Sequence, residues 1–463
     1  MTNFNKPQDI FDWMSRFINL EQGYTPPSMR PERMQIIGAL AGHPEHCAPS
    51  IHIAGSKGKG SITAMGTRIL TEGGLRVARY TSPHITEYRE RITLGDNFFD
   101  DGIYLTAGEK LFALAGILTD STSNEYKAMA EVSDGCAPEP TFFELLTLFY
   151  FLCAQEAKVD AMVIETGMGG ILDPTNICTP EVSVITIIEL EHTEFLGATL
   201  REVATAKAGI IKNNKPVLLA AQNREALDVF IKTAKEKNSP LLYYPDVCTI
   251  EKLRITREGT NCSVRFKTDQ LFDKPLELSL SIPGEVQAQN AAMAAMAVKI
   301  AFPDIDIKTV QKGIAGFKIP ARFEKLQAQP PVIVDGAHTD ISVHLCVQTF
   351  TELYGEDGIL IFGCALGKNA QAMAKSLLPH FSQIIITTPG TYKVSKPEDI
   401  NETFLQMQKE NPQHPTTITF IKETQNGIKT ALGIAGKKNL PVLGIGSFYL
   451  AAEIRDFVFN GTI

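Results

Sequence analysis

Short apolar segments alternate along much of the chain with longer segments whose apolar residues recur every three or four positions. The first pattern is typical of buried strands and the second of helices that pack on one face. Strands alternating with helices favour parallel, doubly wound sheets. We expect strands at 51–54, 77–80, 160–165, 182–188, 216–220, 332–334, 358–362, 383–387, 417–421 and 441–444. We expect helices after residue 61 and at 142–155, 200–211 and 286–300.

Other segments break this alternation. Residues 11–40 are expected to form two helices separated by prolines, and the polar segment 120–140 to be a surface loop. Residues 241–282 switch to short strands with turns, which predicts a local antiparallel sheet. The predicted fold class is therefore α/β, with a parallel-sheet domain, a linker and a smaller Rossmann-like α/β domain. We place these three parts at 1–315, 316–322 and 323–463.

Residues 51–61 read IHIAGSKGKGS and organise the first domain. A predicted strand enters a glycine-rich turn, and a helical pattern follows it. Glycines let backbone N–H groups approach an anion, and a helix N-terminus adds positive potential. On this interpretation Lys59 would contact the β- and γ-phosphates of a nucleotide and Ser61 would bind Mg²⁺. In the strict phosphate-loop pattern Lys and Ser are adjacent, whereas here Gly60 separates them, so an ordinary glycine-rich turn is an equal alternative.

Three more predicted strand ends carry polar residues, and ligands of open α/β sheets gather at such ends. They are 81–84 (TSPH), 165–170 (ETGMGG) and 189–193 (ELEHT). The Glu165 carboxylate suits Mg²⁺, a role that we favour over a helix cap or an ion-pair partner. His192 is as consistent with a metal ligand as with a structural histidine. The simpler interpretation of His84 is packing in a Ser-Pro turn.

The second domain repeats this arrangement at its first strand end, which reads DGAH. Asp335 and His338 could contact the sugar or phosphates of a nucleotide there. A capped turn is the alternative, because Asp and Gly both favour turns. Arg322 lies in the predicted linker, where an exposed charge is the ordinary interpretation.

Composition narrows the functional classes. The chain has 463 residues, so two or three domains are expected. A net charge of -8 disfavours a nucleic-acid partner. The 8 cysteines are scattered without C-x-x-C, and there is no histidine-rich spacing, which favours a reduced, cytoplasmic setting. No signal peptide is visible, and the most apolar run, 142–154, is too short to span a bilayer, so we expect no membrane association.

Taken together, these motifs resemble the folylpolyglutamate synthase/dihydrofolate synthase family of the Mur ligase superfamily, from about Gly38 to the C-terminus. The matching segments of the first domain are AGSKGKGS (54–61), YTSPH (80–84), RERI (89–92), TFFE (141–144), ETGMGGILDPTN (165–176), EHTEFLG (191–197) and AKAGIIK (206–212). The second domain adds PAR (320–322), DGAHT (335–339) and GSFYL (446–450). Their order and spacing together make the resemblance highly specific.

The resemblance implies a phosphate-loop ATPase domain and a set of site residues. ATP would be bound by Gly55, Ser56, Lys57, Gly58, Lys59, Gly60, Ser61, Asn290, Arg322 and Asp335. Two Mg²⁺ ions would be held by Ser61, Ser82, Glu165, His192 and a carbamylated Lys207. The catalytic residues would be Lys59, Lys207 and His338. The substrate would contact Ser82, Pro83, His84, Arg89, Phe143 and Ser447.

Several positions depart from the pattern of the bacterial bifunctional members. Asn is usual where Arg89 stands, Arg where Ile171 stands, and Asn where Thr339 stands. Glu191 and Ala206 replace the usual Asp and Glu, and the G-x-H-Q segment reads GEVQ (284–287). Lys57, Arg89 and Thr339 are similar to the eukaryotic-type folylpolyglutamate synthases. The departures therefore favour polyglutamylation over the use of dihydropteroate.

Lys207 can also be interpreted from its own surroundings. A helical lysine is usually exposed, but the neighbours of Lys207 in the segment 206–211 are small or apolar. Burial would lower the pKa of its amine and make it a nucleophile toward CO₂. The resulting carbamate would offer two oxygens to Mg²⁺. We therefore expect Lys207 to be carbamylated.

The expected function is an ATP-dependent ligase that adds L-glutamate to the γ-carboxyl of a reduced folate through an acyl phosphate. Its partners would be ATP, L-glutamate and the folate, and it would act as a cytoplasmic monomer. One alternative is a bifunctional enzyme that also joins dihydropteroate to glutamate. The others are a related ligase for a different carboxylate and a nucleotide-binding module without ligase activity.

Overall fold

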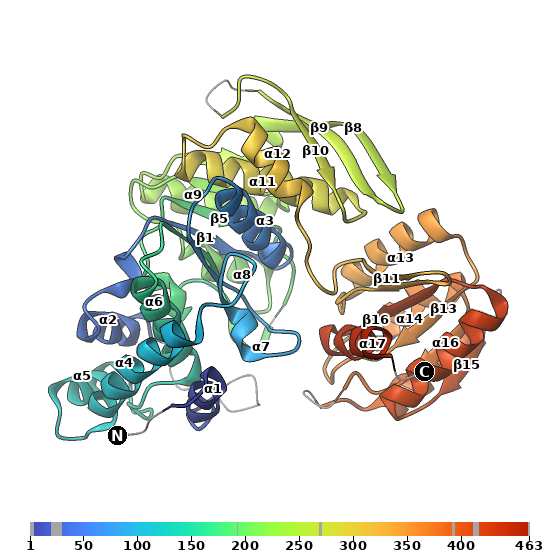
Figure 1. The fold of residues 1–463 in the computed structure, drawn as a ribbon, viewed down its shortest axis with the longest axis horizontal. Coiled ribbons are helices and arrows are strands. Elements are labelled where there is room, and N and C mark those ends of the chain that lie inside the picture. Colours follow the sequence, from blue (N-terminus) through green and yellow to red (C-terminus); the bar gives the residue numbers. More distant parts are fainter. Residues whose placement is uncertain are drawn as a thin grey trace. The chain divides into compact units, whose positions relative to one another are not determined.

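The computed structural model describes residues 4–19, 30–191, 193–267, 271–390, 394–410 and 416–461. The chain divides into two compact units (Figure 1). The first comprises Met1–Arg254, Thr260–Leu280 and Glu285–Phe317, and the second comprises Ile255–Gly259, Ser281–Gly284 and Lys318–Ile463. Each unit is built around its own largely parallel sheet.

A seven-stranded sheet forms the centre of the first unit, in the order β3-β2-β4-β1-β5-β6-β7. Neighbouring strands run parallel except for β3, which is antiparallel to β2. Because β4 and β5 flank β1, the loops that follow these three strands emerge side by side at the carboxyl edge. The strands are β1 (Ser50–Ala54), β2 (Val77–Tyr80), β3 (Ile92–Leu94), β4 (Ala161–Glu165), β5 (Val182–Ile185), β6 (Val217–Leu219) and β7 (Leu241–Tyr243).

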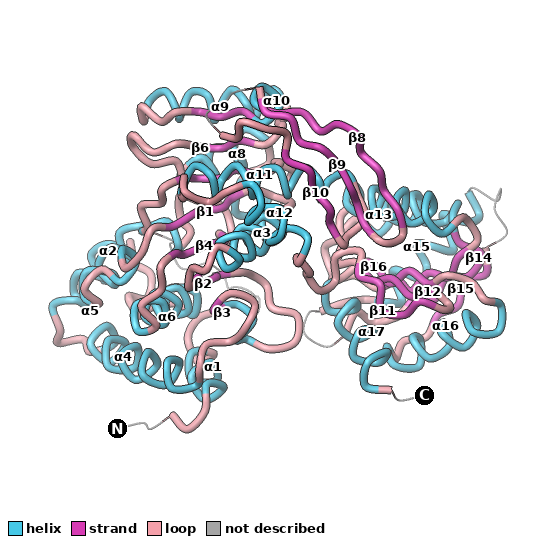
Figure 2. Tube along the Cα trace, turned by 45° about the horizontal axis from the view of Figure 1, so that its top comes forward, coloured by secondary structure: helices cyan, strands magenta, loops and turns pink. Residues whose placement is uncertain are grey.

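Helices cover both faces of this sheet. On one face α3 packs against α11 and α12, and on the other α6 packs against α4, while α8 and α9 pack together (Figure 1). A three-stranded antiparallel sheet in the order β10-β9-β8 lies beside α11 and α12 (Figure 2). Its strands are β8 (Cys248–Thr256), β9 (Gly259–Phe266) and β10 (Leu276–Leu280). The helices are α1 (Pro7–Met14), α2 (Pro31–Leu40), η2 (Pro44–His46), α3 (Lys59–Glu72), η3 (Tyr88–Arg91), α4 (Asp101–Thr119), α5 (Asn124–Val132), α6 (Phe142–Glu156), η4 (Pro174–Ile177), α7 (Thr193–Leu196), α8 (Leu200–Ala208), α9 (Arg224–Glu236), α10 (Tyr244–Val247), α11 (Glu285–Ala301) and α12 (Ile307–Ala315).

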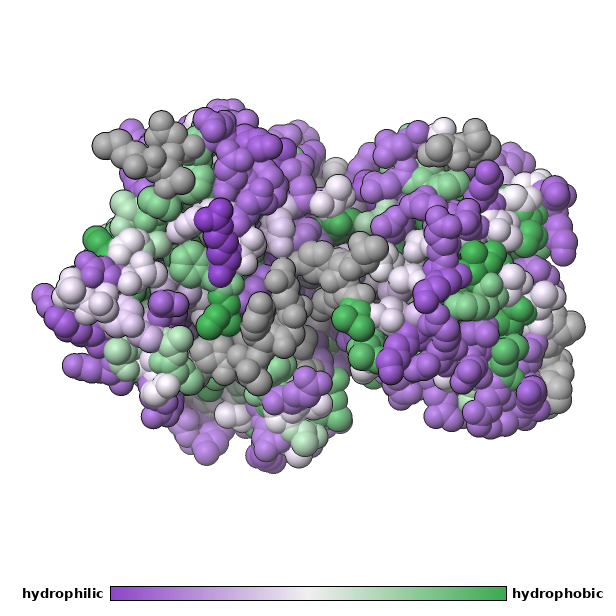
Figure 3. All heavy atoms as spheres, turned by 90° about the horizontal axis from the view of Figure 1, so that it is seen from below, coloured by the Kyte–Doolittle hydropathy of each residue, from purple (hydrophilic) through white to green (hydrophobic). Residues whose placement is uncertain are grey.

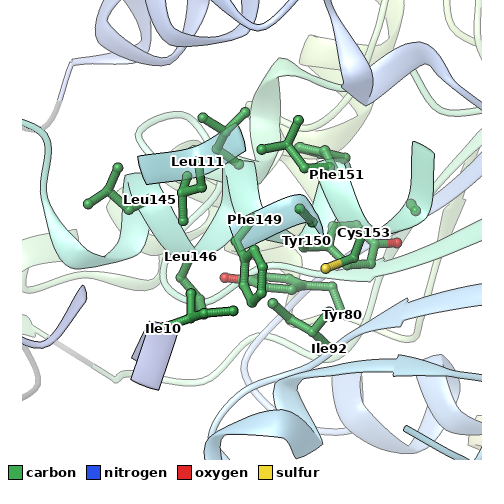
Figure 4. Packing of buried hydrophobic residues seen from close by; sticks show 14 of the residues in the cluster. Ile10, Tyr80, Ile92, Leu111, Leu145, Leu146, Phe149, Tyr150, Phe151 and Cys153 are labelled. Atoms are coloured by element: carbon green, nitrogen blue, oxygen red, sulfur yellow. The ribbon is translucent and has the colours of Figure 1, made fainter. Parts of the chain in front are cut away.

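A large hydrophobic core of the first unit surrounds α6. Alternate residues of β2 and β4, such as Tyr80 and Ile164, face this helix, as the two-residue period of a strand requires. Figure 4 shows Tyr80 and Ile92 packed beside Phe149 and Tyr150 of α6. Because α6 is buried on nearly all sides, its sequence is mostly apolar, and Glu144 and Thr147 are its polar residues before Gln155.

The second unit contains a six-stranded sheet in the order β11-β12-β16-β13-β14-β15, in which only β11 is antiparallel to its neighbour. Its strands are β11 (Glu324–Ala328), β12 (Pro331–Val334), β13 (Gly358–Phe362), β14 (Phe381–Ile386), β15 (Thr417–Phe420) and β16 (Val442–Ile445). Its helices are α13 (Asp340–Tyr354), α14 (Ala370–Leu377), η5 (Leu378–His380), α15 (Pro397–Glu410), α16 (Thr424–Lys438) and α17 (Phe448–Asn460). The βα alternation expected for this part of the chain is confirmed.

The structure corrects several local predictions. The expected surface loop at 120–140 contains α5, which Ser123 caps through its side chain and which buries Met129. Segment 241–243 is not part of the antiparallel sheet, because β7 extends the main sheet beside β6. The strand expected at 182–188 ends at Ile185, and the helix expected at 200–211 ends at Ala208. Gly209 follows this helix in contact with Ile171, where a side chain would not fit.

Hydrophilic residues dominate the face shown in Figure 3, and hydrophobic residues form only scattered patches on it. This is the ordinary distribution for a chain whose large apolar side chains fill its cores. Among the helices of the described residues, none combines the length and the apolarity needed to cross a membrane.

Candidate functional site

The turn after β1 has a backbone shape that only glycine adopts without strain. Gly55 has φ 142°, and a Cβ there would lie 1.8 Å from the Thr186 hydroxyl oxygen. Gly58 has φ 91°, and its Cβ would lie 2.7 Å from Oδ1 of Asn290. The turn therefore passes close to the end of β5 and to α11, and then enters α3 at Lys59. Asn290, the predicted nucleotide contact, is thereby placed against the glycine loop.

Backbone contacts clamp the same turn to the segment that follows β5. Ser56 donates its N–H to the Ile187 carbonyl at 2.9 Å, and its hydroxyl bonds the backbone of Glu189 at 3.0 and 3.1 Å. Lys57 forms a single antiparallel bridge with Ile187. The Ser56 side chain is thus used to hold the loop, and β5 ends early because residues 186–189 fold onto this turn.

Two lysines converge on one carbonyl group at the start of the loop. Lys59 donates from Nζ to the Gly55 oxygen at 2.9 Å, and Lys207, from α8, donates to the same oxygen at 2.8 Å. Lys207 also pairs with Oε1 of Glu191 at 2.9 Å. Two ammonium groups therefore lie at one carbonyl group, and Glu191 pairs with one of them.

Lys207 is buried, with 1% of its side chain exposed. Burial lowers the pKa of Lys207 to about 8, the charge of Lys59 acts in the same direction, and Glu191 opposes the shift. Near neutral pH the amine therefore has a larger neutral fraction than an exposed lysine. The predicted burial of Lys207 is observed.

Oxygen donors suited to a hard divalent cation lie beside the loop. Glu165 ends β4 in a buried position, where its Oε2 accepts a 3.3 Å hydrogen bond from the Ser82 backbone N–H. A Cβ on Gly60 would lie 3.5 Å from the same oxygen, so the carboxylate is close to the first turn of α3. Ser61 is buried in that turn. A carboxylate and a hydroxyl group are ligands that Mg²⁺ prefers. The remaining predicted ligand, His192, lies outside the described residues.

The segment from Thr81 to Arg91 is held mainly by its own contacts. Glu90 accepts hydrogen bonds from three consecutive backbone N–H groups, at 85–87. His84 is buried, its Nδ1 accepts from Arg91 at 2.9 Å, and its ring packs on Tyr88. Arg89 pairs with Glu87 at 2.8 Å and covers the Phe98 ring at 4.4 Å. Pro83 is exposed after a cis peptide bond to Ser82. His84 therefore makes packing contacts, as the simpler interpretation of its turn expected, whereas the pairing of Arg89 with Glu87 was not predicted.

A cavity of about 230 Å³ lies within the first unit, beside the amino end of α6. Phe143 lines it together with residues of α2, of η4 and of the loop after β4. Arg33 and Glu144 form a bidentate pair at its wall, at 2.8 and 3.1 Å, and both side chains are buried. The cavity thus brings the TFFE segment, which holds the predicted substrate contact Phe143, next to the ETGMGGILDPTN segment.

Asp173 shapes the loop that borders this cavity. Its carboxylate accepts hydrogen bonds from the backbone of Met168 and from the backbone and hydroxyl of Thr175. Burial raises the pKa of Asp173, and these hydrogen bonds oppose that shift. The Thr175 hydroxyl also meets Nε2 of the buried His52 at 2.9 Å.

In the second unit the predicted residues gather around Phe448. The Arg322 guanidinium lies 4.5 Å from the Phe448 ring centre, and the His338 ring lies 5.9 Å from it. Nδ1 of His338 lies 2.8 Å from the Gly336 carbonyl oxygen, to which it donates a hydrogen bond. Asp335 accepts from the backbone N–H groups of Phe323 and Ala337. Ser447 caps α17 through the backbone of Tyr449.

Sequence reasoning did not single out Thr186, Asp173 or Phe448. Asp173 and Phe448 lie inside the motifs ETGMGGILDPTN and GSFYL, so their place in these motifs could have marked them as site residues. Thr186 had no such signal, because its role depends on the contact with Gly55 across the sheet.

Two known domain families match parts of this chain. Residues 112–298 match the Mur ligase middle domain, and residues 321–448 match the Mur ligase, glutamate ligase domain. The fold matches that of a solved structure described as Mycobacterium tuberculosis folylpolyglutamate synthase complexed with ADP, with a TM-score of 0.84, 23% identity and 98% of each chain covered. The chain is thus built from Mur ligase domains.

Two curated relatives identify the family to which the chain belongs within this class. The chain is 31% identical to the dihydrofolate synthase/folylpolyglutamate synthase of Bacillus subtilis, over 91% of this chain and 93% of the relative. It is 27% identical to the folylpolyglutamate synthase of Lacticaseibacillus casei, over 91% and 92%. The chain belongs to the folylpolyglutamate synthase/dihydrofolate synthase family. The finer similarity to its eukaryotic-type members stays a prediction.

Proposed function

We propose that this chain is an ATP-dependent ligase that joins the amine of L-glutamate to the γ-carboxyl group of a reduced folate. The observation that carries the proposal is the convergence of Lys59 and Lys207 on the Gly55 carbonyl, in a glycine loop that opens α3. Family membership supports the choice of folate and glutamate as substrates. Reduced folate as the preferred form, and tetrahydrofolate in particular, is the finer part of the proposal.

In the proposed reaction the folate γ-carboxylate attacks the γ-phosphorus of ATP, which gives an acyl phosphate and ADP. The glutamate amine then attacks the acyl carbon, so that an amide forms and phosphate leaves. The loop N–H groups and the α3 N-terminus would hold the nucleotide phosphates, and Lys59 would neutralise charge on the transferred group. Mg²⁺ held by Glu165 and Ser61 would offset the rest of that charge.

We also propose that Lys207 acts as its carbamate. The neutral amine would attack CO₂ and lose a proton, which converts a cation into an anion at the same place. Burial and the lowered pKa of Lys207 support this step. A carbamate beside Glu191 needs a cation for compensation, and a second Mg²⁺ would supply it. Lys59 would then be the remaining ammonium group at the Gly55 carbonyl.

The cavity beside α6 is the proposed site for the folate ring system. Phe143 offers an aromatic face for stacking, and the polar groups of the wall suit the amide and amine edge of a pterin. The contacts of the Arg33–Glu144 pair make that wall rigid. Phe143→Ala should therefore raise the KM for folate more than the KM for ATP.

In the second unit, Arg322 and His338 are the proposed functional pair. Stacking on Phe448 orients the Arg322 guanidinium, and the bond to Gly336 orients the His338 ring. Such fixed side chains suit the recognition of a charged or polar group. Their roles as nucleotide and catalytic residues stay proposals, together with those of Asp335, Ser447, Ser82 and His192.

A second candidate function is the bifunctional enzyme, which would also join dihydropteroate to glutamate. The observation in its favour is the cavity that brings Phe143 together with the loop ending at Asp173. Ile171, which is 38% exposed at that loop, weakens it because arginine is usual there in bifunctional members.

The experiment is phosphate release from ATP by the purified chain with Mg²⁺. We expect release that requires both tetrahydrofolate and L-glutamate, and a reaction with dihydropteroate would establish the second function. Release that ignores glutamate with every folate tested would contradict the ligase assignment. ATP binding without turnover under all conditions would instead indicate a nucleotide-binding module.

A further inference from the structure

The turn between α2 and β1 brings together three residues that the proposed ligase reaction does not use. After α2, Gly42 and His43 both adopt positive φ, of 76° and 56°, and His43 donates its backbone N–H to the Gly38 carbonyl at 2.8 Å. The single turn η2 then carries Glu45 and His46. This tight path folds two imidazole rings over one carboxylate.

Both histidines face the same carboxylate oxygen. His43 Nδ1 lies 2.9 Å from Oε1 of Glu45, and His46 Nε2 lies 3.6 Å from it. The three candidate ligand atoms are all within 4.8 Å of one another. Ligand atoms bound tetrahedrally at 2.0–2.2 Å from a zinc ion lie about 3.4 Å apart, so the set needs only small side-chain rotations to close on a metal.

The carboxylate itself is in an unusual environment. Glu45 is buried, with 4% of its surface exposed. Its Oε2 lies next to Gly38, where a Cβ would be 3.3 Å away. Within the described parts of the chain, that oxygen has no hydrogen-bond partner. A buried carboxylate with an unsatisfied oxygen is costly unless a cation compensates its charge. The two rings, by contrast, have side chains 57% and 51% exposed, so an ion could enter from solvent.

We propose that His43, Glu45 and His46 bind a divalent transition metal of the zinc class, with water in the fourth position. Two imidazole nitrogens and one carboxylate oxygen are a ligand set that zinc accepts, whereas Mg²⁺ prefers oxygen ligands alone. The site precedes β1 and the glycine loop follows it, so the whole strand, about 16 Å long, separates them. The metal would fasten the end of α2 to the start of β1 (Figure 2) and stabilise the first unit.

Zinc titration of the tag-free, full-length chain in excess Mg²⁺ tests the proposal. We expect one equivalent of Zn²⁺ to bind and to raise the melting temperature, and Co²⁺ in its place to give the visible absorption of a four-coordinate ion. Glu45→Gln and the double variant His43→Gln/His46→Gln should each weaken Zn²⁺ binding by about 10²-fold or more. His380→Gln is the matched control, because His380 pairs with a single carboxylate, that of Glu356, at 3.3 Å.

Each outcome of the zinc titration either supports or contradicts the proposed site. Weakened zinc binding in Glu45→Gln and in the double variant, with His380→Gln unchanged, supports the site. Absence of zinc binding by the wild-type chain overturns it. Equal zinc affinity in wild type and in both variants also overturns it, because the ion then binds elsewhere. Circular dichroism of each variant without zinc verifies that the fold is intact.

Discussion

At the scale of single residues, the proposed role of Lys207 gives the sharpest prediction. Its buried amine shares the Gly55 carbonyl with Lys59 and has a pKa lowered to about 8. Lys207→Ala should lower turnover by about 10²-fold or more, because the proposed carbamate ligand could not form. Lys207→Glu should retain more activity, and Lys215→Ala, in a half-exposed pair with Glu181, should retain all of it. Phosphate release with and without added bicarbonate measures this.

The measurement with added bicarbonate distinguishes a carbamylated Lys207 from an unmodified lysine. Wild-type activity should fall in CO₂-depleted buffer and recover with bicarbonate, whereas the activity of Lys207→Glu should not depend on bicarbonate. If Lys207→Ala turned over at the wild-type rate, the lysine would have no part in the reaction.

His52 should make stability depend on pH. Burial, aided by the charge of Lys212, lowers the pKa of His52 to about 3, whereas the unfolded chain has the ordinary value near 6.5. Between these values the unfolded state binds a proton that the folded state excludes. His52 therefore costs nothing above pH 6.5 and destabilises the fold by about 1.4 kcal/mol for each pH unit below it, down to about pH 3.

Urea unfolding of the wild-type chain and of His52→Gln between pH 7 and pH 4.5 tests this. The variant should lose less stability over that range, because glutamine does not titrate. Parallel pH profiles of the two proteins would show that His52 is not the group responsible.

The third prediction at the residue scale concerns the buried ion pair of Arg33 and Glu144. Glu144→Gln leaves the buried guanidinium without its charge partner, which should destabilise the first unit by about 3–5 kcal/mol. Glu251→Gln removes an exposed partner of Arg265 and should leave the denaturation midpoint unchanged. Equal midpoints for both variants would mean that the buried pair adds no stability.

At the scale of elements, the glycine loop joins β1 to α3 in a shape set by Gly55 and Gly58. Gly58→Ala should destabilise the fold by about 1–2 kcal/mol and weaken nucleotide binding, because its φ is positive and Asn290 occupies the space of a Cβ. Gly116→Ala lies inside α4 with open space around it and should stabilise the helix by about 0.5–1 kcal/mol. Thermal melts and nucleotide titrations of the two variants and the wild-type chain measure these effects. Tight nucleotide binding by Gly58→Ala would contradict the role of the loop.

Elements with a strong apolar period could be predicted from the sequence. The fully buried α6 and the strands of both parallel sheets are examples, because burial forces their composition. The amphipathic α5 was missed, because only Met129 is buried in it and its polar flanks are typical of loops. The edge strand β11 was missed because its half-exposed residues lack a clear alternation.

The site itself could be predicted only in part. The loop residues and Glu165 follow from strand ends and glycine spacing. The convergence of Lys207 and Lys59 on one carbonyl and the packing of Thr186 under Gly55 depend on contacts between distant segments, which local sequence does not encode. The contacts of His84 with Arg91 and of Arg89 with Glu87 are local in the sequence, but the pattern of apolar and polar residues does not specify which side chains pair within such a turn.

At the scale of the whole molecule, the central claim is ligation through an acyl phosphate. The most direct measurement uses tetrahydrofolate whose γ-carboxyl carries heavy oxygen, with ATP, Mg²⁺ and L-glutamate, followed by mass spectrometry of both products. The account predicts one added glutamate per ADP formed, and one heavy oxygen atom from the carboxyl group in each released phosphate. Phosphate without heavy oxygen, or ADP formed without the glutamylated folate, would contradict it.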